Sequence, residues 1–130
     1  MLTRRTMIAV LALLPLAGPA RADGVETKPL SVAEMQADGG LIVDIRRPEE
    51  WAETGVIDGA RLLTFTDAQS FIAAVGADLA DGRDLILICH SGRRSAAAAE
   101  ALHSMIPNRI ISVEGGMGRI IDDGYQTVAP

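Results

Sequence analysis

The sequence is poor in cysteine, histidine and aromatic residues. Its 130 residues include one cysteine, two histidines, one tryptophan, one tyrosine and two phenylalanines. A single cysteine excludes a disulfide within the chain, so the core has to be held by aliphatic packing. No cluster of cysteine, histidine and carboxylate residues has metal-ligand spacing, so we expect no metal and no other cofactor.

Basic residues are in the minority as well. Twelve lysines and arginines face seventeen aspartates and glutamates, which gives a formal charge of −5. Loss of residues 1–22 would remove three basic residues and no acidic ones, leaving nine against seventeen and a charge of −8. An acidic surface repels nucleic acid and anionic lipid, so neither is an expected partner.

The longest apolar stretch lies near the N-terminus, between Met7 and Leu16. Arg4 and Arg5 precede it, and Ala20-Arg21-Ala22 has the small residues of a cleavage site. About a dozen apolar residues are too few to span a bilayer core of roughly 30 Å. We predict a signal peptide at 1–22, cleaved after Ala22, and a periplasmic domain at 23–130 that does not attach to the membrane. An uncleaved anchor and a core helix are alternatives, and both Sec and twin-arginine export stay open.

Aliphatic runs and helix signals alternate along the remaining chain. Strands are predicted at 25–30, 41–45, 61–63, 85–88 and 110–113, and helices at 31–39, 48–55, 67–75, 95–105 and around 120–125, after a sharp turn at 114–116. Runs of branched aliphatic residues are typical of parallel strands covered on both faces. We expect one three-layer α/β/α domain with a five-stranded, mainly parallel sheet, in which Trp51 anchors the core or a lid.

The run Leu85–Ile88 stops at Cys89 and gives way to small and cationic residues. Ser95 is predicted to cap the alanine-rich helix that follows. A strand, a tight loop and a helix start would bring several backbone N–H groups to one positive point, where a thiol ionises below its free pKa of about 8.5. We interpret Cys89 as a candidate nucleophile. The alternative is a cysteine that only fills the core, although its place at a strand end and an oxidising compartment argue against this.

Several segments together resemble one protein family. These are Asp44–Trp51, Gly55–Ala60, Cys89–Ser95, Glu114–Gly116 and Gly124–Tyr125. In this order and spacing, the chain resembles an exported single-domain rhodanese, a thiosulfate sulfurtransferase, from about Leu30 to Val128. The resemblance implies a sheet order of 1-5-4-2-3 with the cysteine loop after the fourth strand. Val56 and Ile120 depart from the histidine and tryptophan common in the family, at positions away from the reacting sulfur.

The resemblance implies that Cys89 takes the outer sulfur of thiosulfate as a persulfide and passes it to cyanide or a thiol. The residues expected to bind the anion are His90, Ser91, Gly92, Arg93, Arg94 and Ser95. Arg94 is predicted to face the substrate, with Arg93 as second choice, and one of the two can instead pair with an acidic residue. Asp44 and Arg46 are placed behind the site, where Asp44 either tethers Arg94 or the loop, or pairs with Arg46.

Two other functions stay open. One is a persulfide carrier that accepts sulfur from a partner protein and acts little on free thiosulfate. The other is a phosphatase or arsenate reductase, which is disfavoured because four residues separate Cys89 from Arg94, one fewer than in those enzymes. The residues do not specify the physiological donor and acceptor, and we expect a monomer.

Overall fold

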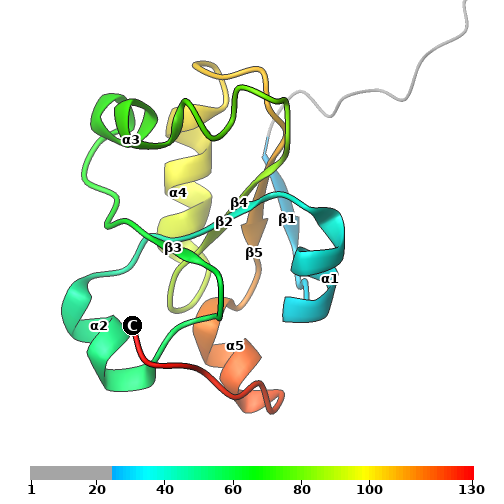
Figure 1. Ribbon diagram of the computed structural model, residues 1–130, viewed down its shortest axis with the longest axis vertical. Coiled ribbons are helices and arrows are strands. Elements are labelled where there is room, and N and C mark those ends of the chain that lie inside the picture. The colour runs from blue at the N-terminus through cyan, green and yellow to red at the C-terminus, as the bar shows by residue number, and fades with distance from the viewer. Residues whose placement is uncertain (1–24) are drawn as a thin grey trace, which may run out of the picture.

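A computed structural model of the chain describes residues 25–130 and contains five strands and five helices in regular alternation (Figure 1). The signal peptide predicted at 1–22 lies outside the described residues. The strands are β1 (Glu26–Lys28), β2 (Leu41–Asp44), β3 (Arg61–Leu62), β4 (Leu85–Ile88) and β5 (Ile110–Val113). The helices are α1 (Val32–Asp38), α2 (Pro48–Thr54), α3 (Ala68–Val75), α4 (Arg93–Leu102) and α5 (Gly116–Asp122). The alternation predicted from the aliphatic runs is confirmed.

All strand pairs in the sheet are parallel, in the order β1-β5-β4-β2-β3. This is the order that the resemblance implied. β4 lies at the centre, paired with β2 on one side and with β5 on the other. All four of its residues are buried, because helices cover both faces of the sheet.

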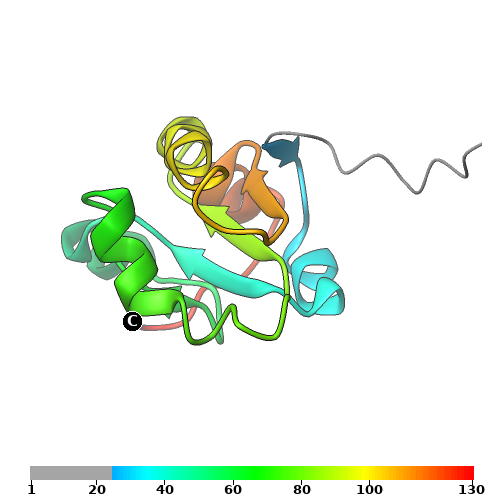
Figure 2. The same cartoon turned by 90° about the horizontal axis from the view of Figure 1, so that it is seen from above.

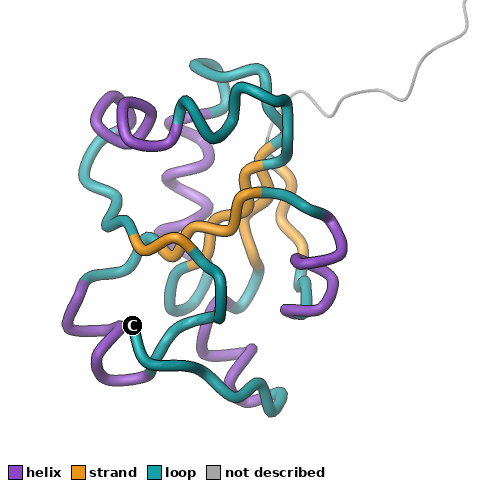
Figure 3. The backbone as a smooth tube through the Cα atoms, viewed as in Figure 1, coloured by secondary structure: helices purple, strands orange, loops and turns teal. Residues whose placement is uncertain are grey.

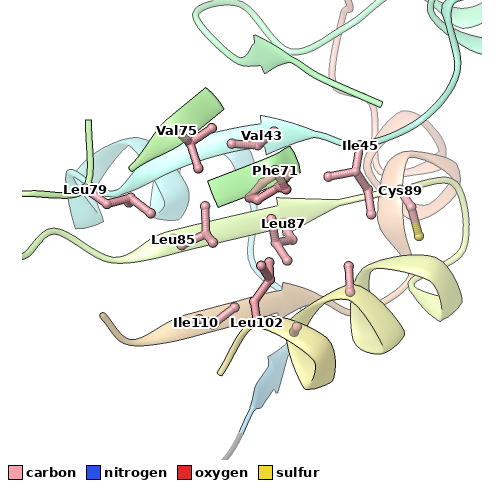
Figure 4. Close-up of a cluster of buried hydrophobic side chains, with 12 residues drawn as sticks. Val43, Ile45, Phe71, Val75, Leu79, Leu85, Leu87, Cys89, Leu102 and Ile110 are labelled. Atoms are coloured by element: carbon pink, nitrogen blue, oxygen red, sulfur yellow. The ribbon is translucent and has the colours of Figure 1, made fainter. Parts of the chain in front are cut away.

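Two apolar clusters fill the space between the sheet and its helices. The helices α3 and α4 cover one face of the sheet (Figure 2). There, Phe71 and Val75 of α3 and Leu102 of α4 pack against Leu85 and Leu87 (Figure 4). On the other face, α1 and α5 supply Val32, Met35, Met117 and Ile120, which pack against Ile42, Ile86, Ile88 and Ile111. Side chains in successive strand positions point to opposite faces, so β2, β4 and β5 each supply residues to both clusters.

Parallel pairing places the ends of β2 and β4 side by side. Asp44 is in register with Ile88, and the Ile45 N–H donates to the Ile88 carbonyl over 3.0 Å. Whatever follows these two strands therefore meets at one edge of the sheet, the usual location of ligand sites in open α/β sheets. The C-terminal segment passes below the same edge (Figure 3), where Val128 forms a two-residue bridge with Val56.

Some local predictions were wrong. Ser95 does not cap α4, which begins at Arg93 with Gly92 as its capping residue, so Ser95 lies inside the first turn. α4 also ends at Leu102, short of the predicted 105. Of the two roles predicted for Trp51, the core anchor is wrong, because α2 buries none of its residues, and the lid anchor stays a prediction. The indole N–H of Trp51 is enclosed without a hydrogen-bond partner among residues 25–130. Within this same range, no helix has the length and apolar character needed to cross a membrane.

Candidate active site

The loop between β4 and α4 is short because Gly92 reverses the chain with a φ of 98°. A Cβ at this position would lie 3.1 Å from the Gly115 nitrogen and 3.3 Å from the Val113 carbonyl oxygen. Glycine thus allows both the left-handed turn and the close approach of the β5–α5 connection. The result is a tight ring from Cys89 to Ser95, at the carboxyl edge of the sheet.

Backbone and hydroxyl groups of this ring converge on the Cys89 sulfur. The N–H groups of Gly92 and Ser95 donate to Sγ over 3.1 and 3.4 Å, and the Ser95 hydroxyl lies 3.5 Å away. Cys89 itself is 0 % exposed and closes the row of apolar side chains along β4 (Figure 4). The sulfur is therefore enclosed as a core cysteine would be, yet it accepts hydrogen bonds as an anion would.

These contacts change how readily the thiol ionises. Burial acts to raise the pKa of Cys89, because it penalises the charged thiolate. The Ser95 hydroxyl and the N–H groups of Ser95, Gly92 and Ser91 act the other way and outweigh it, so the pKa is lowered from its ordinary value. The loop thus raises the thiolate fraction near neutral pH.

The loop is also held from below by α5. The N–H groups of Met117 and Gly118, in the first turn of α5, donate to the carbonyl oxygens of Cys89 and His90 over 2.8 and 3.0 Å. Gly116 makes this docking possible, since a Cβ there would overlap both of those oxygens. The peptide whose His90 carbonyl is held by α5 also carries the Ser91 N–H, one of the groups that lower the pKa of Cys89.

The two arginines of the motif lie in different surroundings. Arg94 forms a forked ion pair with Glu50 of α2, with both N–O distances at 2.7 Å. Arg94 lowers the pKa of Glu50 to about 2, and Glu50 raises that of Arg94. Arg93 is exposed at the first position of α4. The predicted first choice for facing the substrate, Arg94, is therefore the arginine whose charge is already compensated.

Asp44 and Arg46 form a second, fully buried ion pair. The Arg46 guanidinium donates to both Asp44 carboxylate oxygens, and its other contacts are Thr54 Oγ1 at 2.9 Å and the Gly55 carbonyl at 3.1 Å. Both side chains are 0 % exposed. Of the two alternatives for Asp44, the structure has the pairing with Arg46, which ties the end of β2 to the end of α2. Arg94 and the cysteine loop are held by other groups.

The sequence of the domain and its geometry point to the same family. A sequence model of the rhodanese-like domain matches residues 28–123. The chain belongs to the rhodanese family. This confirms the resemblance found in the motifs.

Known rhodanese relatives include named sulfurtransferases. The chain is 31 % identical over 88 residues to thiosulfate sulfurtransferase GlpE of Pseudomonas aeruginosa, a match covering 68 % of this chain and 76 % of that protein. It is 27 % identical over 106 residues to a sulfurtransferase of Allochromatium vinosum, covering 82 % and 94 %. Among solved structures, a protein of unknown function from Rhodopseudomonas palustris, described as a possible tyrosine phosphatase, is 29 % identical with a TM-score of 0.64, covering 80 % of this chain and 85 % of that one.

One polar residue of this rhodanese site was missed by the sequence reasoning. Ser112 lies in β5, is 0 % exposed, and its Oγ is 2.7 Å from Ser95 Oγ. The available signal was a lone hydroxyl within the aliphatic run Ile110–Val113, since buried polar groups need a partner. That partner comes from α4, seventeen residues earlier, so spacing alone did not point to it.

The remaining predicted residues line the outside of the rhodanese loop. His90 and Ser91 are exposed, and the Ser91 N–H contributes to lowering the pKa of Cys89. In the described part of the chain, no group of three or more histidine, cysteine or acidic residues is arranged to hold a metal ion.

Proposed function

We propose that this protein is a thiosulfate sulfurtransferase that works through a persulfide on Cys89. The Cys89 thiolate attacks the outer sulfur of thiosulfate, the bond between the two sulfurs of thiosulfate breaks, and sulfite leaves with the electron pair. A thiophilic acceptor, either cyanide or a thiolate, then attacks the terminal sulfur and releases Cys89 as a thiolate. This is covalent catalysis in two displacements, without an oxidant or a cofactor.

The convergence of N–H groups on the single thiol carries this proposal. Donors at 3.1 and 3.4 Å stabilise negative charge on sulfur without having to reorganise, and removal of one such donor in other enzymes costs roughly 3 to 4 kcal/mol of transition-state stabilisation. His90, Ser91 and Arg93 border the loop and are the groups we propose to meet the incoming anion. A ring with four residues between Cys89 and Arg94 favours a sulfur atom over a larger tetrahedral phosphate.

One observation favours a second candidate, a persulfide carrier supplied by a partner protein. Arg94 is the arginine predicted to face the anion, and its charge is compensated by Glu50. This ion pair weakens the attraction for free thiosulfate. A carrier would use the same Cys89 thiolate and receive its sulfur from a partner's persulfide. The two candidates differ in turnover with small donors.

Thiocyanate formation from thiosulfate and cyanide tests the main proposal, with Cys89→Ser as the inactive control. We expect steady turnover by the natural chain and none by the variant. Turnover at the level of Cys89→Ser, together with a gain of one sulfur atom by mass spectrometry after incubation with a protein persulfide, would favour the carrier. Hydrolysis of an aryl phosphate that is lost in Cys89→Ser would instead support a phosphatase.

We further propose that the domain acts as a periplasmic monomer after removal of residues 1–22. The composition of that segment and the acidic charge of the remainder support this view. N-terminal sequencing of protein recovered from the periplasm would begin at Asp23, and sedimentation would give the mass of one chain. Recovery of uncleaved protein in the membrane fraction would contradict it.

A further inference from the structure

Ser95 and Ser112 form a closed hydrogen-bonded pair behind the Cys89 sulfur. Both are 0 % exposed, and their hydroxyl oxygens are 2.7 Å apart. The Ser95 oxygen also lies 3.5 Å from Cys89 Sγ and 3.1 Å from the Gly92 carbonyl oxygen. The Ser95 hydroxyl therefore has three polar neighbours but only one hydrogen atom that it can donate to them.

Counting hydrogens fixes the direction of the pair when Cys89 is ionised. A thiolate has no hydrogen to donate, so the Ser95 hydroxyl is the donor in its contact with the sulfur. A charged acceptor attracts that hydrogen more strongly than the neutral Gly92 carbonyl does. The hydrogen between the two serines must then come from Ser112, whose hydroxyl donates to the Ser95 oxygen.

We propose that Ser112 is a positioning residue for the sulfur-transfer reaction, which keeps the Ser95 hydrogen directed at Cys89 and so favours the thiolate. A hydroxyl that accepts a hydrogen bond becomes a stronger donor, since chains of hydrogen bonds polarise one another in a buried site. Without Ser112, the Ser95 hydroxyl is a weaker donor and is free to turn to Gly92. The inference rests on the proposed function in that Cys89 acts as a thiolate.

The other charged groups around the sulfur, and the one histidine beside it, are independent of Ser112. They are Arg93 and Arg94 of α4, Glu50 of α2, His90 of the loop, and the Asp44–Arg46 pair at the end of β2. β5 and α5 present the Ser112 hydroxyl and the N–H groups of Met117 and Gly118. None of the charged groups is hydrogen-bonded to Ser112 in the described residues, so its replacement leaves their charges in place.

Two substitutions form a matched pair for the test. Ser112→Thr and Ser112→Val place nearly the same shape in β5 and differ mainly in hydroxyl against methyl, so packing strain is common to both. Ser112→Ala removes the hydroxyl without adding volume. Cys89 is the only cysteine, so the ultraviolet absorbance of the thiolate can be followed against pH on the whole chain. The same titration of Cys89→Ser serves as the blank, and its subtraction removes the absorbance of Tyr125.

We expect the thiolate titration of Ser112→Ala and Ser112→Val to move to higher pH, while Ser112→Thr stays near the natural protein. Below the midpoint this corresponds to roughly a three- to tenfold smaller thiolate fraction, the size expected for one hydrogen bond. Equal titrations for Thr and Val, or an unmoved titration for Ala, would overturn the inference.

A second measurement shows whether the effect passes through Ser95. In a Ser95→Ala background, Ser112→Ala should produce no further shift, and an undiminished shift there would contradict the relay even if the Val variant fails to fold. Thiocyanate turnover separates the two proposals. Absent turnover with an intact Ser112 effect would defeat only the proposed function, whereas normal turnover without that effect would defeat only the role of Ser112.

Discussion

Replacement of Gly116 by alanine tests whether α5 holds the cysteine loop. An added Cβ would overlap the carbonyl oxygens of Cys89 and His90, which are the two atoms bound by the first turn of α5. The loop and the helix would have to separate, and the hydrogen bonds at 2.8 and 3.0 Å would stretch or break. Gly116 also has a φ of 55°, where a side chain adds strain.

The expected loss of stability can be added up from these contributions. The left-handed backbone costs a non-glycine residue about 1–2 kcal/mol, and each buried carbonyl left without its donor costs about 1–3 kcal/mol. Gly116→Ala should therefore lower the free energy of unfolding by about 3–8 kcal/mol, a large part of the 5–15 kcal/mol typical of a domain. Turnover should fall as well, because the loop N–H groups would no longer be aimed at the sulfur.

Gly82→Ala is the matched control. Gly82 has a φ of 85° and lies in the turn before β4, away from the cysteine loop, and an added Cβ would meet no atom within 4 Å. This variant should lose only the backbone contribution, about 1–2 kcal/mol, and keep its activity. Urea unfolding and thiocyanate formation on both variants measure the difference. A Gly116→Ala protein as stable and active as Gly82→Ala would refute the anchoring role of α5.

Two ion pairs yield further predictions. Glu50→Gln should free the charge of Arg94 and lower KM for thiosulfate about 1.5- to 5-fold at low salt. The difference in KM should shrink as salt is added. An unchanged KM would mean that the ion pair does not affect substrate binding. Because the Glu50 pKa is lowered from 4.5 to about 2, the pair stabilises the fold above the higher value and is lost as the pH falls toward the lower one. Acid unfolding of Glu50→Gln should thus be less steep over that interval, and a curve parallel to that of the natural protein would contradict it. Arg46→Ala leaves the buried Asp44 carboxylate without its ion-pair partner and should cost about 3–5 kcal/mol by denaturant unfolding, against less than about 1 kcal/mol for Arg83→Ala, whose ion pair is exposed. Equal losses in these two variants would mean that burial does not set the cost.

The fold was predictable because its signals are local. The buried run Leu85–Ile88, the capping box at Ser31 and the proline that opens α2 each act within a few residues, and the strand and the two helices lie close to the predicted ranges 85–88, 31–39 and 48–55. The order of the strands was not contained in these signals, and it came from the family resemblance. The capping role given to Ser95 was wrong because Gly92 turns the chain earlier than a serine cap would.

The candidate site was predictable in its centre and not in its supports. Cys89 and its loop form one continuous motif, so the sequence displays them together. The partner of Arg94 lies 44 residues away on α2, and the partner of Ser95 lies 17 residues away on β5. Such pairs depend on how the layers pack, which a single sequence does not reveal when many acidic residues and serines compete as partners.

The docking of α5 under the loop also orders events in time. Residues 116–118, which include the N–H donors to the carbonyls of Cys89 and His90, are synthesised more than twenty residues after the cysteine. A chain that ends before this point contains the complete cysteine loop but lacks the hydrogen bonds from α5 that hold the loop. We therefore expect the Cys89 thiol to become fully reactive only after α5 has folded and docked under the loop.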